Sequence, residues 1–403
     1  MVRVAADAGV RNHGIMVYWN NERNEDHEDN EMVTAVWCSG VLAGWMSLHC
    51  RGTKKRIGNL YTLAAAILFL SCNNSSPDEL NLGIMYDYGM NELNLSGVLY
   101  SLLVMLARQL SVSFSLFNFL TAAAALILIV HTLSRYTQSW GFALGLYLMS
   151  GAILDVSLYR QFLASAFVVC GFRYLITEQK QPGKYVLCIV LAASIHLAMA
   201  VYLIFGILGL EGRIRSRFYF CIIRGAFIGS AALSVLTLLN HRVIPGIMLL
   251  ERLIGGRDSN KLEGYIQSAG GRYGWLLSAM LWILSVYAVY LFLKGRDTAS
   301  SGAVVTYMRE IKNIFALSIC FLPFCIMMAV VFSRLYRPMV WLIILMASVL
   351  AQEVPEKVLD VRVAAGTGLY LGYYFLCFNG IFADWKLFTE MIFQGTLFWI
   401  QGA

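Results

Sequence analysis

From residue 32 almost to its end, the chain alternates long apolar runs with short polar connections. A helix needs about 20 apolar residues to cross the hydrocarbon core of a bilayer, and fewer where the bilayer or neighbouring helices adapt. The pattern therefore predicts an all-α polytopic integral membrane protein with about 11 to 13 transmembrane helices. The clear candidate spans are residues 32–49, 57–72, 114–133, 140–155, 161–176, 218–239, 273–293, 313–332, 338–350 and 363–382.

Basic residues gather in four short connections, at 51–56, 177–184, 211–217 and 294–297. Short loops rich in Lys and Arg stay on the cytoplasmic side of a membrane. We therefore predict that all four connections lie inside. This orientation fixes the side on which every other connection emerges.

The segment 95–110 could either cross the membrane or lie along its surface. If it crossed, the basic connections at 177–184 and 211–217 would fall outside, against the orientation rule. We therefore predict an amphipathic interfacial helix on the outer side. Residues 73–113 and 240–272 then form the main extracytoplasmic loops.

Residues 185–210 lie between two basic connections, so this segment must cross outward and return. Twenty-six residues are few for two full spans. We predict two short helices that meet at His196, below the outer surface. Broken helices at membrane depth are tolerated where they line a cavity in the protein. The alternative is that His196 is an ordinary packing residue.

Composition supports the membrane assignment and excludes several other classes. Hydrophobic residues make up 59% of the chain and charged residues only 14%, whereas soluble domains carry about 25% charged residues. The net charge of +7 is spread over short loops, which indicates orientation signals and no nucleic-acid partner. The nine cysteines are dispersed without metal-binding spacing, so we expect no metal, cofactor or disulfide framework.

The first 31 residues differ from the rest because they are polar and carry the acidic cluster NERNEDHEDNE. They are too hydrophilic for a cleavable signal peptide. We predict a disordered segment at 1–31 and a single transmembrane domain at 32–403.

The predicted topology brings several polar residues to the outer face. Arginine there runs against the orientation rule, and an anionic ligand would explain it because guanidinium binds phosphate in a bidentate fork. The alternatives are a simple surface turn at 155–160 and, for Arg337, anchoring to lipid headgroups. The residues concerned are Asp78, Asp155, Arg160, Gln161, His196, Arg252, Arg334, Tyr336 and Arg337.

The stretch YRQFLASAFVVCGFRYLITEQKQPGKYVLCIVLAASIHLAMAVYLI resembles the EpsG family of bacterial exopolysaccharide polymerases. The family pattern is an Arg-Gln-x-x-Ala helix, a basic turn, and a short apolar helix ending in Ala-x-x-x-His. Arg160, Gln161, Ala164 and His196 match it. SRLYRPMVWLIIL at 333–345 is similar to a later element of the family, with tighter spacing.

The resemblance implies a Wzy-type polymerase, a glycosyltransferase that joins undecaprenyl-pyrophosphate-linked repeat units at the outer face of the bacterial cytoplasmic membrane. Exopolysaccharide or capsule would be the product, and a flippase and a chain-length regulator of the same pathway would be possible partners besides membrane lipids. The layout is also similar, more weakly, to GT-C glycosyltransferases. A flippase or transporter for lipid-linked sugars and a membrane O-acyltransferase are the alternative functions.

Such a transfer needs a base for the acceptor hydroxyl and fixed positive groups for the departing pyrophosphate. As catalytic residues we expect Arg160, His196, Asp78 and Asp155. We further expect Asp155 to orient Arg160 across a turn. As substrate-binding residues we expect Gln161, Arg334, Tyr336, Arg337 and Arg252.

Overall fold

The computed structural model describes residues 28–71, 83, 86, 97–212, 214, 216–239, 274–295, 302–323, 333–353 and 361–375. Every regular element in these ranges is a helix, which confirms the all-α prediction. The predicted loop 240–272 and the segment 1–27 lie outside the described residues.

Among the described residues, the N-terminal half contains three helices of 20 or more residues and several shorter ones. In chain order these are α2 (Glu28–His49), α3 (Gly52–Ser71), α5 (Val98–Gln109), α6 (Phe114–Leu133), α7 (Trp140–Ser150), α8 (Ala152–Ser157), α9 (Tyr159–Phe172), α10 (Pro182–Ile195) and the 3₁₀-helix η2 (Leu197–Leu210).

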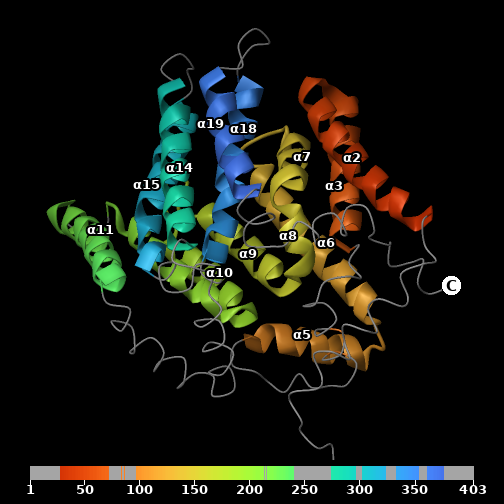
Figure 1. Cartoon of the computed structure of the whole chain (residues 1–403), viewed down its shortest axis with the longest axis horizontal. Coiled ribbons are helices and arrows are strands. Elements are labelled where there is room, and N and C mark those ends of the chain that lie inside the picture. Colours follow the sequence, from red (N-terminus) through yellow and green to blue (C-terminus); the bar gives the residue numbers. More distant parts are fainter. Residues whose placement is uncertain are drawn as a thin grey trace, which may run out of the picture.

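The C-terminal half adds further helices, and the last two of them pack against α7 (Figure 1). They are α11 (Ser216–Leu239), α14 (Gly274–Gly295), α15 (Gly302–Leu317), η4 (Ser318–Phe321), η5 (Ser333–Tyr336), α18 (Arg337–Glu353) and α19 (Val361–Phe375).

Four segments among the described helices are long and apolar enough to cross a membrane: Met32–His49, Phe114–Leu133, Ser216–Leu236 and Arg334–Gln352. Several other apolar helices are shorter, including α7, α10 and η2. These findings support a polytopic membrane protein, and the total of 11 to 13 spans stays a prediction.

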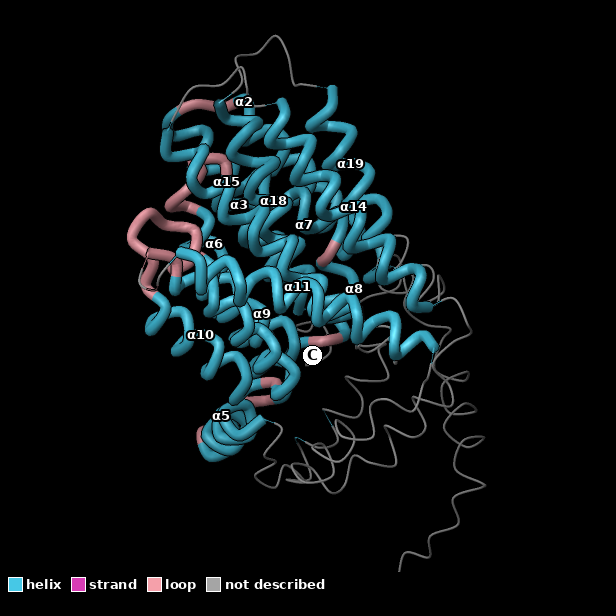
Figure 2. The backbone as a smooth tube through the Cα atoms, turned by 90° about the vertical axis from the view of Figure 1, so that its left-hand side faces the viewer, coloured by secondary structure: helices cyan, strands magenta, loops and turns pink. Residues whose placement is uncertain are grey.

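Helix α5 lies across one end of the bundle, roughly perpendicular to α3, α7 and α14 (Figures 1 and 2). Its buried residues Tyr100, Val104 and Ala107 follow a helical period and face the protein. Leu102 and Leu106 are exposed on its other side. This is the arrangement expected of the interfacial helix predicted at 95–110. In the predicted topology, this end of the bundle is the outer face.

The predicted break at His196 is confirmed. Helix α10 ends at Ile195, His196 is extended with φ −145° and ψ 106°, and η2 begins at Leu197. A 3₁₀-helix rises about 2.0 Å per residue, so the 14 residues of η2 extend about 28 Å, against about 21 Å for an α-helix. The 3₁₀ form therefore lets this short segment cover most of a bilayer core.

Close backbone packing joins α2 to α7 through two facing Gly-x-x-x-Gly sequences. Gly40 and Gly44 lie on α2, and Gly141 and Gly145 lie on α7. A β-carbon built on Gly44 would lie 2.7 Å from the carbonyl oxygen of Gly141 and 2.9 Å from the α-carbon of Gly145. Small residues let helices approach this closely in lipid, where there is little hydrophobic force between helices.

Two predicted spans differ from the structure. The span 140–155 is divided at Gly151 into α7 and α8. Helix α15 begins at Gly302, eleven residues before the predicted span 313–332. The predicted span began at 313 because the residues before it are charged. One of them, Glu310, is nevertheless buried in α15, with 1% of its surface exposed, because a cationic side chain pairs with it.

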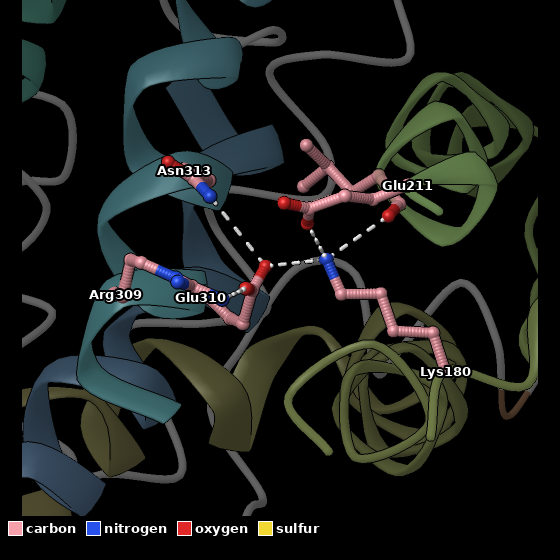
Figure 3. Close-up of polar contacts among 6 residues, drawn as sticks. Lys180, Glu211, Arg309, Glu310 and Asn313 are labelled. Carbon is pink, nitrogen blue, oxygen red and sulfur yellow. Dashed lines mark hydrogen bonds and ion pairs between the residues drawn. The ribbon is translucent and has the colours of Figure 1, made fainter. Parts of the chain in front are cut away.

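That partner is Lys180, in the connection between α9 and α10 (Figure 3). Its ammonium lies 2.7 Å from Glu310 and 2.5 Å from Glu211, which follows η2. One lysine thus joins three segments. It also places the predicted cytoplasmic connections 177–184 and 211–217 side by side.

Candidate functional site

Arg160 is held between two helix ends. Leu158, with φ −126° and ψ 48°, interrupts the chain between α8 and α9, so Arg160 is the second residue of α9. Its Nε donates a hydrogen bond of 2.7 Å to the carbonyl oxygen of Ile195, the last residue of α10. The C-terminus of a helix carries partial negative charge, which stabilises the guanidinium, whereas the N-terminus of α9 favours anions.

His196 follows directly on this carbonyl group and is half-buried. Its Nδ1 is buried and has no hydrogen-bond partner among the described residues. Both Arg160 and Arg334 are close enough to act electrostatically on the imidazole. The structure therefore brings the predicted Arg160, His196 and Arg334 together.

Gln161 connects this group to the turn that carries Arg334. Its side chain is 5% exposed, and its Nε2 donates a 3.2 Å hydrogen bond to the carbonyl oxygen of Arg334. The hydroxyl of Tyr202 in η2 donates to the next carbonyl, that of Leu335. The turn at η5 is thus fixed from two sides, and Gln161 contacts the backbone of a neighbouring element.

Helix α5 covers Arg160 from the end of the bundle. The guanidinium carbon lies 5.6 Å from the centre of the Tyr100 ring, which supports a cation–π interaction. Gly97, just before α5, approaches so closely that an added β-carbon would meet the guanidinium and lie 2.8 Å from the carbonyl oxygen of Ile195. Sequence reasoning missed both residues, because no local pattern shows that α5 packs on Arg160.

Asp155 pairs with Arg337, and the expectation that it orients Arg160 is corrected here. Its carboxylate forms an ion pair with Arg337 and accepts a 2.7 Å hydrogen bond from the hydroxyl of Tyr147. Asp155 is 6% exposed and Arg337 is 4% exposed. Their charges compensate each other inside the bundle, which is the condition for burying ionised groups. This geometry suits a structural role for both residues, and their expected roles in catalysis and substrate binding stay predictions.

Tyr336 also lies in the interior. It is fully buried, its ring packs against Phe321, and its hydroxyl donates to the carbonyl oxygen of Ser318 at 3.4 Å. Of the expected substrate-binding residues in this turn, only Arg334 is partly exposed and near His196.

The remaining expected site residues, Asp78 and Arg252, lie outside the described part of the chain. Within the described part, no three His, Cys, Asp or Glu residues gather in a way that could hold a metal ion. The arrangement instead offers two guanidinium groups, a helix N-terminus and an imidazole. Together these can bind an anion and accept a proton beside it.

A family model matches most of the chain. The model of the EpsG family matches residues 60–382, which include the C-terminal part of α3, the described helices from α5 to α19 and every residue of this site. No curated protein and no solved structure matches the chain.

Proposed function

Because the chain belongs to the EpsG family, a family of polysaccharide-polymerase type, we propose that it is a Wzy-type glycosyltransferase of exopolysaccharide or capsule synthesis. It would join repeat units carried on undecaprenyl pyrophosphate at the outer face of the bacterial cytoplasmic membrane. The observation that carries the proposal is the meeting of Arg160, Arg334 and His196 beside the interfacial helix α5.

In this proposal the two guanidinium groups bind the pyrophosphate of the donor, together with the N-terminus of α9. The bond between the anomeric carbon and the phosphate oxygen breaks, and the acceptor hydroxyl forms the new glycosidic bond. Undecaprenyl pyrophosphate leaves with the bonding electron pair, and positive groups stabilise its growing negative charge.

The acceptor hydroxyl must lose its proton during this transfer. His196 suits that role because its Nδ1 makes no hydrogen bond within the described structure, so a neutral imidazole could receive the proton there. Asp78 stays a second candidate for the base. Gln161 acts through its hydrogen bond to the Arg334 backbone, which fixes the second guanidinium-bearing segment.

The test compares cells that carry wild type, Arg160→Lys or Arg160→Ala at matched membrane expression, with surface-glycan chain length as the measurement. A site that needs the planar guanidinium fork loses most long chains in both variants, because lysine supplies only a point charge. Arg224→Lys, at an exposed position on α11, is the matched control. Normal long chains from both Arg160 variants would remove Arg160 from the mechanism.

A deletion strain separates the proposal from its alternatives. A polymerase defect leaves single repeat units at the surface and no long chains. Repeat units trapped inside the cell would indicate a flippase, and long chains that lack only acyl groups would indicate an O-acyltransferase.

A further inference from the structure

A second group of cations lies far from the candidate site, where α6, α9 and α10 meet. Arg135 follows the end of α6, Arg173 caps the end of α9, and Lys184 is in the first turn of α10. We call these three residues the basic cluster. None of them forms an ion pair with a carboxylate within the described part of the chain.

Tyr174 and Tyr136 bring the basic cluster together. Arg173 lies 4.5 Å and Lys184 lies 5.8 Å from the centre of the Tyr174 ring. The guanidinium of Arg173 also donates a 2.7 Å hydrogen bond to the Tyr174 hydroxyl. From the α6 side, the Tyr136 hydroxyl donates to the carbonyl oxygen of Arg173 at 3.3 Å.

Two cations that share one ring repel each other, and an anion bound beside them would offset that repulsion. Lys184 adds to the positive end of the α10 dipole, where the first backbone N–H groups also attract anions. The neighbouring Lys180 differs from the basic cluster, because two carboxylates, Glu211 and Glu310, compensate its charge (Figure 3). The one carboxylate between α9 and α10 is Glu178, which is exposed. The basic cluster therefore carries an excess of positive charge.

The length of α6 shows where this charge lies relative to the membrane. α6 begins shortly after α5 and has 20 residues, which span about 30 Å. That length matches the hydrocarbon core of a bilayer. If α5 lies in the outer interface, Arg135 lies at the inner one, and Tyr136 and Tyr174 have the amphipathic rings typical of this level.

We propose that the basic cluster binds the phosphate headgroup of an anionic phospholipid from the cytoplasmic leaflet. Basic side chains between helix ends on this side of a membrane are suited to such headgroups. The proposal does not depend on the polymerase function. It assigns a lipid site to a surface that is separated from the outer site by the thickness of the bilayer.

The experiment titrates the purified full-length protein in detergent with phosphatidylglycerol or phosphatidylethanolamine and counts retained lipids by native mass spectrometry. We expect Arg135→Gln, Arg173→Gln and Lys184→Gln each to weaken phosphatidylglycerol retention by roughly fivefold, and the triple variant by about 100-fold. Arg173→Lys keeps the charge and should retain most of the lipid. Phosphatidylethanolamine retention should not change.

The matched control is the triple variant Arg51→Gln, Lys54→Gln and Arg56→Gln. It removes the same charge from exposed residues on the same predicted face. Equal loss in both triple variants, or loss in neither, would overturn the proposal. So would displacement of the lipid by millimolar inorganic phosphate, because that result indicates a site for a free anion. If the triple variant does not fold, the single variant Arg135→Gln still tests the proposal, because Arg135 is exposed and its replacement leaves the interior unchanged.

Discussion

The buried pair of Asp155 and Arg337 gives the sharpest test of how the structure revises the expected site. Asp155→Asn keeps the shape of the side chain and removes its charge. Arg337, with a side chain 3% exposed, would then remain inside the bundle without its counter-charge. Removing one member of a buried ion pair costs about 3–5 kcal/mol of folding free energy. Part of that cost arises because the Tyr147 hydroxyl would then donate to a neutral amide oxygen and no longer to a charged carboxylate.

The double variant Asp155→Asn with Arg337→Gln removes both charges and leaves polar groups of similar size. Replacing both members of a buried pair is often far less costly than removing one. We therefore expect the double variant to be more stable than Asp155→Asn alone, by at least about 1 kcal/mol. Such a recovery is the mark of a pair whose two charges act on each other.

The assay is thermal unfolding in detergent, followed by the amount of monodisperse protein that survives heating, with glycan chain length measured in parallel. Glu178→Gln, an exposed carboxylate in the α9–α10 connection, controls for loss of one negative charge. If Asp155→Asn were as stable as wild type but made no long chains, the structural role would be wrong and the expected catalytic role would return.

Three further predictions test other parts of the structure. Gly44→Leu should destabilise the protein by about 1–3 kcal/mol or more, because its side chain would meet the α7 backbone; Gly225→Leu, with open space around it, should be neutral in the same unfolding assay. Tyr100→Phe should keep long glycan chains because the ring over Arg160 remains, whereas Tyr100→Leu should shorten them; equal chain lengths would show that the ring contact is dispensable. Arg108→Cys on α5 should react with membrane-impermeant thiol reagents only from outside, and labelling from the cytoplasm alone would reverse the topology.

Much of the fold could be predicted because the decisive information is local. The position of His196 between two basic connections required two short helices, and the structure has them on either side of that residue. The basic connections at 177–184 and 211–217 likewise required the segment 95–110 to lie along the surface, where the structure has α5. Where the prediction missed the start of α15, a distant partner decided the outcome. Glu310 is acceptable inside a helix bundle because Lys180 reaches it from 130 residues away in sequence.

The candidate site shows the same division between local and distant information. Arg160, Gln161 and His196 could be selected from their place beside apolar runs. The approach of Arg334, Tyr100 and Gly97 required the folded arrangement of η5 and α5. The sequence indicated which side chains could bind an anion or accept a proton, but it did not indicate which residues of other helices would contact them.

The three arginines expected at the outer face show why a departure from the orientation rule does not by itself identify a ligand site. Arg337 is compensated inside the protein by Asp155, so its position needs no external anion. Arg160 donates a hydrogen bond to the carbonyl group at the end of α10 and lies against the Tyr100 ring, beside His196. Arg334 is partly exposed and acts on the same histidine as Arg160. The case for a phosphate ligand therefore rests on Arg160 and Arg334, and a variant of Arg337 that loses stability says nothing against it.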